Sequence, residues 1–188
     1  MAKKANAVTH WLQTTAVRNA RVHFIFIIAY ILTIIVFDSW NLYTHQAASQ
    51  LWTAGGVLLI INTIIWYFSR LNFSKTSYYV GLILLLVLAD IGFASYNVYW
   101  QHGLASKSVM LFGVPIITAA TLRSRSTLLA TTTLCAAAYS IASVRYFFTN
   151  YGLSYRVELW GTVGFYSALF FVLALLLMVI IVPTDERF

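Results

Sequence analysis

The chain has 188 residues and a formal net charge of +7, with 61% hydrophobic and 9% charged residues. Soluble domains carry about 25% charged residues, so this composition, with a mean hydropathy of +0.80, excludes an ordinary soluble protein. Two prolines, nine glycines and one cysteine, Cys135, also exclude a collagen and a disulfide-stabilised scaffold. The composition is that of an integral membrane protein.

Residues 1–21 form a basic segment in front of the first long apolar run. Within it, apolar residues recur at helical spacing, at Val8, Trp11, Leu12 and Ala16. This pattern is typical of an amphipathic helix at a membrane interface. The alternative is a cationic tail that only sets the orientation of the protein, and the sequence leaves both open.

Six apolar runs follow, and most approach the roughly 20 residues that a helix needs to cross a bilayer. The runs lack the alternation of a transmembrane β-barrel. The sequence therefore predicts an all-α, polytopic membrane protein, with a bundle of six transmembrane helices over residues 22–182 and a short tail at 183–188. The predicted spans are residues 22–37, 51–68, 78–98, 108–122, 126–148 and 159–182.

Lysine and arginine are distributed unevenly between these spans. Nine lie in the N-terminal segment, the second and fourth loops and the tail, and three lie on the opposite side. The positive-inside rule then predicts that both termini are cytoplasmic. The net charge fits an anionic inner leaflet as the partner, rather than a nucleic acid.

The predicted fourth span carries Gly113 and Pro115 near its middle. Proline removes a helical hydrogen bond, so we expect this helix to bend or open there. The bend is either a working part or a packing adjustment. Only a few residues around Arg123 and Arg125 join this span to the next, which predicts a tight hairpin anchored by arginine at the inner head groups.

Small residues at helical spacing allow helices to approach closely in lipid. Gly161, Gly164 and Ala168 supply such a face on the sixth span, and Ala138 and Ala142 supply one on the fifth. We expect these faces to pack within the bundle. A homodimer contact through the sixth span is the alternative.

Asp90 and Arg145 are the only charged residues inside the predicted spans. An ionisable group within the bilayer is a functional candidate by default. Asp90 has Asn97 on the same helical face, and a long guanidinium stem would let Arg145 form a buried pair with it. The alternatives are a protonated Asp90 hydrogen-bonded to Asn62 or a tyrosine, or a bound cation. Asp90, Arg145, Pro115, Asn62 and Asn97 are thus the candidate switch residues.

Aromatic and polar residues gather at the predicted outer ends of the spans. An interfacial aromatic belt is the general explanation for such a rim, and a ligand pocket beneath it is the alternative. The glutamate of the rim has a further alternative, a pair with Arg145 or Arg156. The rim residues that are candidates for ligand contact are Trp40, His45, Trp100, His102 and Glu158.

The sequence predicts no cofactor, metal or catalytic site. No two histidines lie inside spans to hold a haem, no span contains a lysine for a retinal Schiff base, and His45 with His102 lack an evident third metal ligand. Motifs of hydrolases, metalloproteases and phosphate-binding loops are absent. We therefore expect a protein that is not an enzyme.

Residues 110–130, with Pro115 before Arg123 and Arg125, resemble the membrane-embedded input regions of bacterial sensor histidine kinases. In those regions a proline-containing span runs into an arginine-containing hairpin turn and then into a span rich in alanine and leucine. The resemblance implies a six-span sensory module in a bacterial cytoplasmic membrane, with the kinase effector absent from this chain. It implies no fixed ligand-binding residues.

The leading hypothesis is accordingly a non-enzymatic sensory or regulatory module. One alternative is a small transporter or channel subunit that uses Asp90, because a kinked span and a buried acid suit a pathway. Another is a structural subunit that binds a partner membrane protein through its helix faces.

Overall fold

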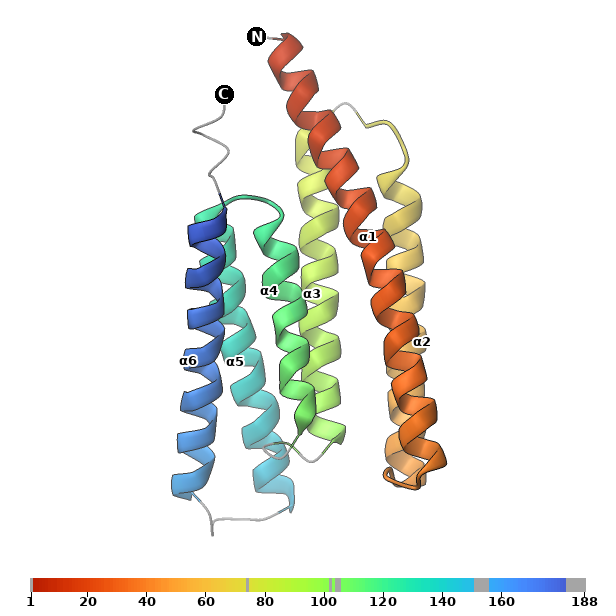
Figure 1. Cartoon of the computed structure of the whole chain (residues 1–188), viewed down its shortest axis with the longest axis vertical. Coiled ribbons are helices and arrows are strands. Elements are labelled where there is room, and N and C mark those ends of the chain that lie inside the picture. The colour runs from red at the N-terminus through yellow and green to blue at the C-terminus, as the bar shows by residue number, and fades with distance from the viewer. Residues whose placement is uncertain (1, 74, 102, 104–105, 151–155, 182–188) are drawn as a thin grey trace. The chain divides into compact units, whose positions relative to one another are not determined.

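The computed structural model describes residues 2–73, 75–101, 103, 106–150 and 156–181, which form helices and short connections without any strand. Figure 1 shows these elements in chain order. The chain consists of two compact units, Met1–Ala89 and Asp90–Phe188, and the boundary between them lies within the third long helix. The elements are α1 (Ala2–Ser39), α2 (His45–Ser69), α3 (Thr76–Trp100), the 3-10 helix η2 (Lys107–Phe112), α4 (Gly113–Ala120), α5 (Arg125–Asn150) and α6 (Arg156–Ile180).

Five of these helices, α1, α2, α3, α5 and α6, are long and apolar enough to cross a bilayer. α1, α2, α3 and α5 each contain the predicted span and extend beyond it at both ends, whereas α6 begins three residues before its predicted span and ends two residues before the end of that span. Helices satisfy their backbone groups internally, which is the condition for crossing hydrocarbon. By length and composition, the chain is a multi-pass helical membrane protein.

The predicted fourth span differs from the other five. Residues 107–120 form a shorter apolar helix, in which η2 passes directly into α4 two residues before Pro115. At the rises of the two helix types, these residues cover about 24 Å, less than the hydrocarbon thickness of about 30 Å. The described helix is therefore shorter than a full transmembrane span, and the change of helix type at Gly113 lies in the region where the sequence predicted that the fourth span bends or opens.

In the first unit, α1 packs against α2, and the two lie side by side and antiparallel (Figure 1). The carbonyl of Leu51 accepts a 3.5 Å hydrogen bond from the hydroxyl of Tyr30. A buried cluster of Ala20, Ile65 and Leu86 brings α1, α2 and the N-terminal part of α3 together. Close packing of this kind replaces the hydrophobic force that helices lack in lipid.

The basic N-terminal segment is continuous with the first span, because α1 runs without a break from Ala2 to Ser39. Leu12 and Ala16 are buried. Thr9 bonds to the hydroxyl of Thr76 at 2.7 Å, and the amide of Gln13 donates to Asn72 Oδ1 at 3.0 Å. Leu12 and Ala16 of the predicted apolar face are thus buried, while the neighbouring Thr9 and Gln13 contact the start of α3 and the connection from α2 to α3.

Asn62 lies at the centre of the first unit and is fully buried. Its amide donates a 3.0 Å hydrogen bond to the carbonyl of Ala20 and so ties α2 to α1. Its side-chain oxygen accepts no hydrogen bond from the described residues. Interhelical hydrogen bonds in membrane proteins contribute on average only about 0.6 kcal/mol, so this bond fixes the register of the pair more than its stability.

In the second unit, α4 packs against both α5 and α6, and α5 packs against α6. An aromatic cluster fills the space between them. The ring of Phe112 lies 5.5 Å from that of Phe170 and 6.0 Å from that of Tyr139, and Tyr139 lies 5.7 Å from Tyr166. Tilted and edge-to-face pairs at these distances are favourable, so the cluster holds the short η2–α4 segment against the two long helices.

The turn from α4 to α5 is as tight as predicted. α4 ends at Ala120 and α5 begins at Arg125. Arg123 has a φ of 54°, in the left-handed region that reverses a chain after a helix. The hydroxyl of Ser124 accepts a hydrogen bond from the backbone N–H of Thr127 and caps the start of α5.

Hydroxyl side chains within the helices bond back to their own backbone. Thr63, Thr118, Thr132 and Ser140 each donate to the carbonyl four residues earlier, at 2.7 to 2.9 Å. This arrangement satisfies a polar group without a neighbouring helix. These residues can therefore lie in a span without defining a site.

The prediction for the small-residue face of α6 was wrong. Gly161, Gly164 and Ala168 are exposed, and a Cβ added at either glycine would meet no other atom within 4 Å. The buried face of α6 instead carries Leu159, Val163, Phe170 and Ala174. The core of the second unit is aromatic, so α6 is held at the distance that rings require.

Two adjacent glycines of α2 give a stability test of the first unit. A Cβ at Gly55 would lie 3.3 Å from Tyr30 Cε1, whereas a Cβ at Gly56 would meet nothing within 4 Å. We predict that Gly55→Val lowers the free energy of unfolding by about 1–3 kcal/mol, because the tyrosine ring must move. Gly56→Val, the matched control, should change it by less than about 0.5 kcal/mol. Unfolding of the purified protein in mixed micelles with increasing dodecyl sulfate measures both, and equal losses would contradict the packing described here.

Candidate functional site

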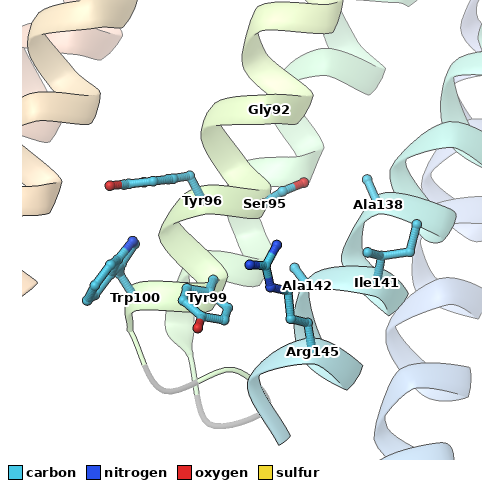
Figure 2. A pocket seen from close by; sticks show the side chains of 9 residues that line it. All are labelled: Gly92, Ser95, Tyr96, Tyr99, Trp100, Ala138, Ile141, Ala142 and Arg145. Atoms are coloured by element: carbon cyan, nitrogen blue, oxygen red, sulfur yellow. The ribbon is translucent and has the colours of Figure 1, made fainter. Parts of the chain in front are cut away.

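A groove lies in the second unit between the C-terminal part of α3 and α5. Its volume is about 650 Å³, within the range of small-molecule sites. Figure 2 shows the groove with its lining side chains. It is lined by Gly92, Ser95, Tyr96, Tyr99 and Trp100 from α3 and by Ala138, Ile141, Ala142 and Arg145 from α5.

Helical periodicity explains why these residues line one groove. Both sets follow three- and four-residue spacings, which place side chains on one face of a helix. On α5, three small or aliphatic residues precede Arg145 along that face, and on α3 Gly92 and Ser95 precede the aromatic residues. The groove therefore has a small-residue end and an aromatic, cationic end.

Of the described residues that line the groove, only Arg145 is charged. Its guanidinium carbon lies 5.6 Å from the centre of the Tyr99 ring. Figure 2 shows the guanidinium directed into the groove, away from the C-terminal end of α5. A cation over an aromatic face is worth about 0.5–1 kcal/mol at an exposed site, so Tyr99 orients the arginine side chain.

The aromatic wall of α3 is held together by ring contacts. Tyr99 and Trp100 meet edge to face at 5.7 Å, and Tyr96 lies 6.2 Å from Trp100. Tyr99 also contacts Tyr146 of α5 at 6.0 Å. In Figure 2, Tyr96 and Trp100 point away from α5, whereas Ser95 points toward it. The rings thus border the groove and leave its inner part to small side chains.

A chain of hydrogen bonds fixes the end of α3 below the groove. Asn97 Oδ1 accepts from the amide of Gln101 at 3.4 Å, and Gln101 Oε1 accepts from the hydroxyl of Ser108 at 2.6 Å. Ser106 caps η2 by accepting from the backbone N–H of Ser108. The predicted polar residue Asn97 therefore connects α3 to η2.

Gly103 lies in that connection with a φ of 58°, and a Cβ there would overlap the ring of Tyr146. Glycine is required at this position for both reasons. This close approach of backbone and ring holds the end of α3 against α5, at the aromatic end of the groove.

Asp90 is buried, with 2% of its surface exposed. It interacts electrostatically with Cys135 of α5, which places these two residues at one level of the second unit. Tyr99 and Arg145 mark another level, nine residues further along α3, a distance of about 14 Å. The structure therefore does not bring Asp90 and Arg145 together as a buried pair.

The predicted rim residues belong to both units. Trp40 and His45 are exposed and belong to the first unit, whereas Trp100 and Glu158 belong to the second. His102 lies outside the described residues, as do the tail 183–188 and the side chain of Arg156. Only Trp100 lines the groove. Glu158 lies in the first turn of α6, where a negative charge is favourable.

Near the rim of the first unit, Tyr43 lies in the connection between α1 and α2 and contacts the ring of Phe37 at 5.7 Å. Partial burial raises the pKa of its hydroxyl above the ordinary value. Tyr43 therefore stays neutral throughout the physiological pH range, which suits an interfacial aromatic residue.

The remaining predicted residues lie in or beside the turn from α4 to α5 and at the start of α4. Pro115 is buried in the first turn of α4, where its missing N–H leaves no helical bond unmade. Arg123 forms the reversing turn, and Arg125 is exposed at the start of α5. Among the described residues, no group of three or more His, Cys, Asp or Glu side chains could hold a metal ion.

The sequence left a ligand pocket beneath the aromatic rim open as an alternative, but it did not place that pocket between α3 and α5. Ala138 and Ala142 were predicted to be a packing face, and Trp100 was assigned to the aromatic rim. A usable signal was present, because Ala138, Ile141, Ala142 and Arg145 share one helical face. A helical face with small residues followed by an arginine would have indicated a groove with one positively charged end.

No protein-family model, no curated protein and no solved structure matches this chain. The function must therefore be argued from the geometry of the site itself.

Burial of Cys135 predicts its reactivity. The side chain is fully buried, and its sulfur lies 4.0 Å from the carbonyl oxygen of Phe112. Buried structural thiols are inert, so we expect no measurable alkylation by N-ethylmaleimide in the folded protein and complete alkylation after denaturation. Ser126→Cys, exposed near the start of the same helix, is the control and should react in the folded state. Mass spectrometry distinguishes the two sites, and rapid modification of native Cys135 would contradict the packing around Phe112.

Proposed function

We propose that the chain is a non-enzymatic sensory or regulatory module of a bacterial cytoplasmic membrane. The observation that carries this proposal is the groove between α3 and α5, which presents one guanidinium beside an aromatic wall. A ligand in this groove would contact both helices and so favour one relative position of α3 and α5. Occupancy is thereby coupled to helix packing within the second unit.

Two further features support this function. The passage from η2 to α4 just before Pro115 gives the second unit a segment with two helix types, and such segments often mark hinges. The resemblance of residues 110–130 to histidine-kinase input regions points to the same role. In this proposal, Pro115 lies at the hinge and the groove biases it, while an effector outside this chain receives the signal.

The proposed orientation places both termini and the α4–α5 turn in the cytoplasm. Its support is the concentration of lysine and arginine on that side, including Arg123 and Arg125. The aromatic, cationic end of the groove then lies at the outer leaflet. Arg145 lies five residues before the end of α5, or about 8 Å along the helix axis, which is the level of the outer head groups.

Two variants, each with one added cysteine, test this orientation. Leu42→Cys lies in the α1–α2 connection and Ser126→Cys follows the α4–α5 turn, and both positions are exposed. We expect a membrane-impermeant maleimide to label Leu42→Cys in intact spheroplasts and Ser126→Cys only after the membrane is opened. The native Cys135 is buried and should not be labelled in either variant, so it serves as the internal negative control. The reverse labelling pattern would invert the topology.

Spin labels test the coupling between the hinge and the packing of the unit. Ile117 on α4 and Thr133 on α5 are exposed, and nitroxides on cysteines at these positions report the α4–α5 distance. We expect two distance populations in lipid nanodiscs, and we expect Pro115→Ala to shift their ratio at least about fivefold, equivalent to about 1 kcal/mol. Ala130→Cys paired with Ala168→Cys, on α5 and α6, is the control pair and should not change. A single population unaffected by Pro115→Ala would contradict the sensory function.

A small transporter or channel subunit is the second candidate, and the burial of Asp90 favours it. Purified protein in proteoliposomes distinguishes the two functions. Proton or cation flux above that of empty vesicles, lost in Asp90→Asn, would support transport. The sensory function predicts no such flux.

A further inference from the structure

The groove between α3 and α5 has the chemical pattern of an amphiphile. Arg145, Tyr99 and Trp100 form its polar end, and Gly92, Ala138, Ile141 and Ala142 form its apolar end. The nine residues from Gly92 to Trp100 span about 12 Å along the helix. A ligand that fills this length therefore needs a charged head and an aliphatic body.

The charge at the polar end has no acidic partner in the described part of the chain. The described acids are Asp38, Asp90 and Glu158. Arg145 instead contacts the neutral ring of Tyr99. Arg145 is exposed, and its guanidinium is directed into the groove beside Tyr99, so an anion that enters the groove comes within reach of the positive charge. The polar end thus selects a negatively charged head group.

The number and shape of the charges favour a carboxylate. A single guanidinium offers a planar pair of N–H donors, which matches the two oxygens of one carboxylate. Among the described lining residues there is no second cation for the second charge of a phosphate monoester. A neutral alcohol would leave the guanidinium unmatched.

The apolar end has room for a chain and opens sideways. A Cβ added at Gly92 would meet no atom within 4 Å. Ile141 is 68% exposed, so the groove is accessible from outside the second unit. In a bilayer, an alkyl chain can enter such a groove without crossing water.

We propose that this groove binds a long-chain carboxylate, with its head on Arg145 and its alkyl chain along Gly92, Ala138 and Ile141. The inference deepens the proposed function, on which it rests for the regulatory meaning of binding. It assigns the ligand class of the sensory module: a single-chain anionic amphiphile that reaches the site from the outer leaflet.

A photoreactive fatty acid tests the proposal. The full chain is placed in phosphatidylcholine nanodiscs with dodecanoate that carries a diazirine on its alkyl chain, and the crosslinked peptides are mapped. We expect saturable crosslinks in residues 92–99 and 138–145 that unlabelled dodecanoate displaces. Crosslinks spread without saturation over the exposed apolar residues of α1 and α6 would show simple partitioning into lipid and overturn the proposal.

Two variants separate the head from the chain. Arg145→Gln should weaken dodecanoate binding at least about tenfold, as expected for a hydrogen bond to a charged group, and should leave competition by dodecanol unchanged. Gly92→Leu should weaken both ligands, because its side chain enters open space in the groove. Gly164→Leu, which also meets open space but on α6, is the control and should bind like the parent protein.

Further outcomes decide between ligand classes and between the two proposals. Unchanged dodecanoate affinity in Arg145→Gln would overturn the role of the guanidinium. Dodecyl phosphate that competes about tenfold better than dodecanoate would overturn the carboxylate assignment. Dodecanoate binding without any change in the α4–α5 spin-label distances would keep the site and reject the sensory function. If added membrane lipids changed those distances but dodecanoate did not bind, the sensory function would be kept and the carboxylate site would be rejected.

Discussion

The hydrocarbon core of a bilayer offers no water to hydrogen-bond with, so each backbone N–H and C=O there must find its partner within the protein. The described chain meets this condition with helices, and its hydroxyl side chains follow the same rule by bonding back to the carbonyl one turn earlier. Polar side chains that do not bond back to their own helix therefore indicate where helices contact each other or where a site lies. Asn62 ties two helices together, Asp90 is buried, and Arg145 directs its charge into a groove. The candidate site is one of these exceptions.

The same constraint explains how much of the fold the sequence predicts. Long apolar runs must be helical in lipid, so the five long helices follow from composition alone, and so does the hairpin at Arg123 and Arg125, where too few residues remain for a longer connection. Length is decisive here, because periodicity is weak in helices that are apolar on every side. The change from η2 to α4 lies two residues before Pro115, whereas a bend there stays a prediction from the effect of the proline ring on the preceding helical turn.

Contacts between helices are not determined in this way. The sequence pattern assigned the small residues Gly161 and Gly164 to a buried face, but the neighbouring helices are spaced by the rings of Tyr139 and Phe170, and the glycines remain exposed. An ion pair between Asp90 and Arg145 would balance the two charges inside the predicted spans. It requires the two side chains to lie at the same level, which depends on the relative register of α3 and α5 and is not encoded in the pattern of either helix alone. For the same reason, the groove could be recognised only after both of its walls were in place.

The continuity of α1 has a mechanical consequence. Thirty-eight residues without a break form a rod of about 57 Å, and helices bend sharply only at a proline, a glycine pair or a similar defect. α1 contains neither proline nor glycine. A twist or a piston movement applied near Ser39 is therefore delivered with little loss at the opposite end, where α1 contacts the α2–α3 connection through Thr9 and Gln13. In the first unit, α1 is thus a rigid helix that transmits a movement at Ser39 to contacts at its opposite end.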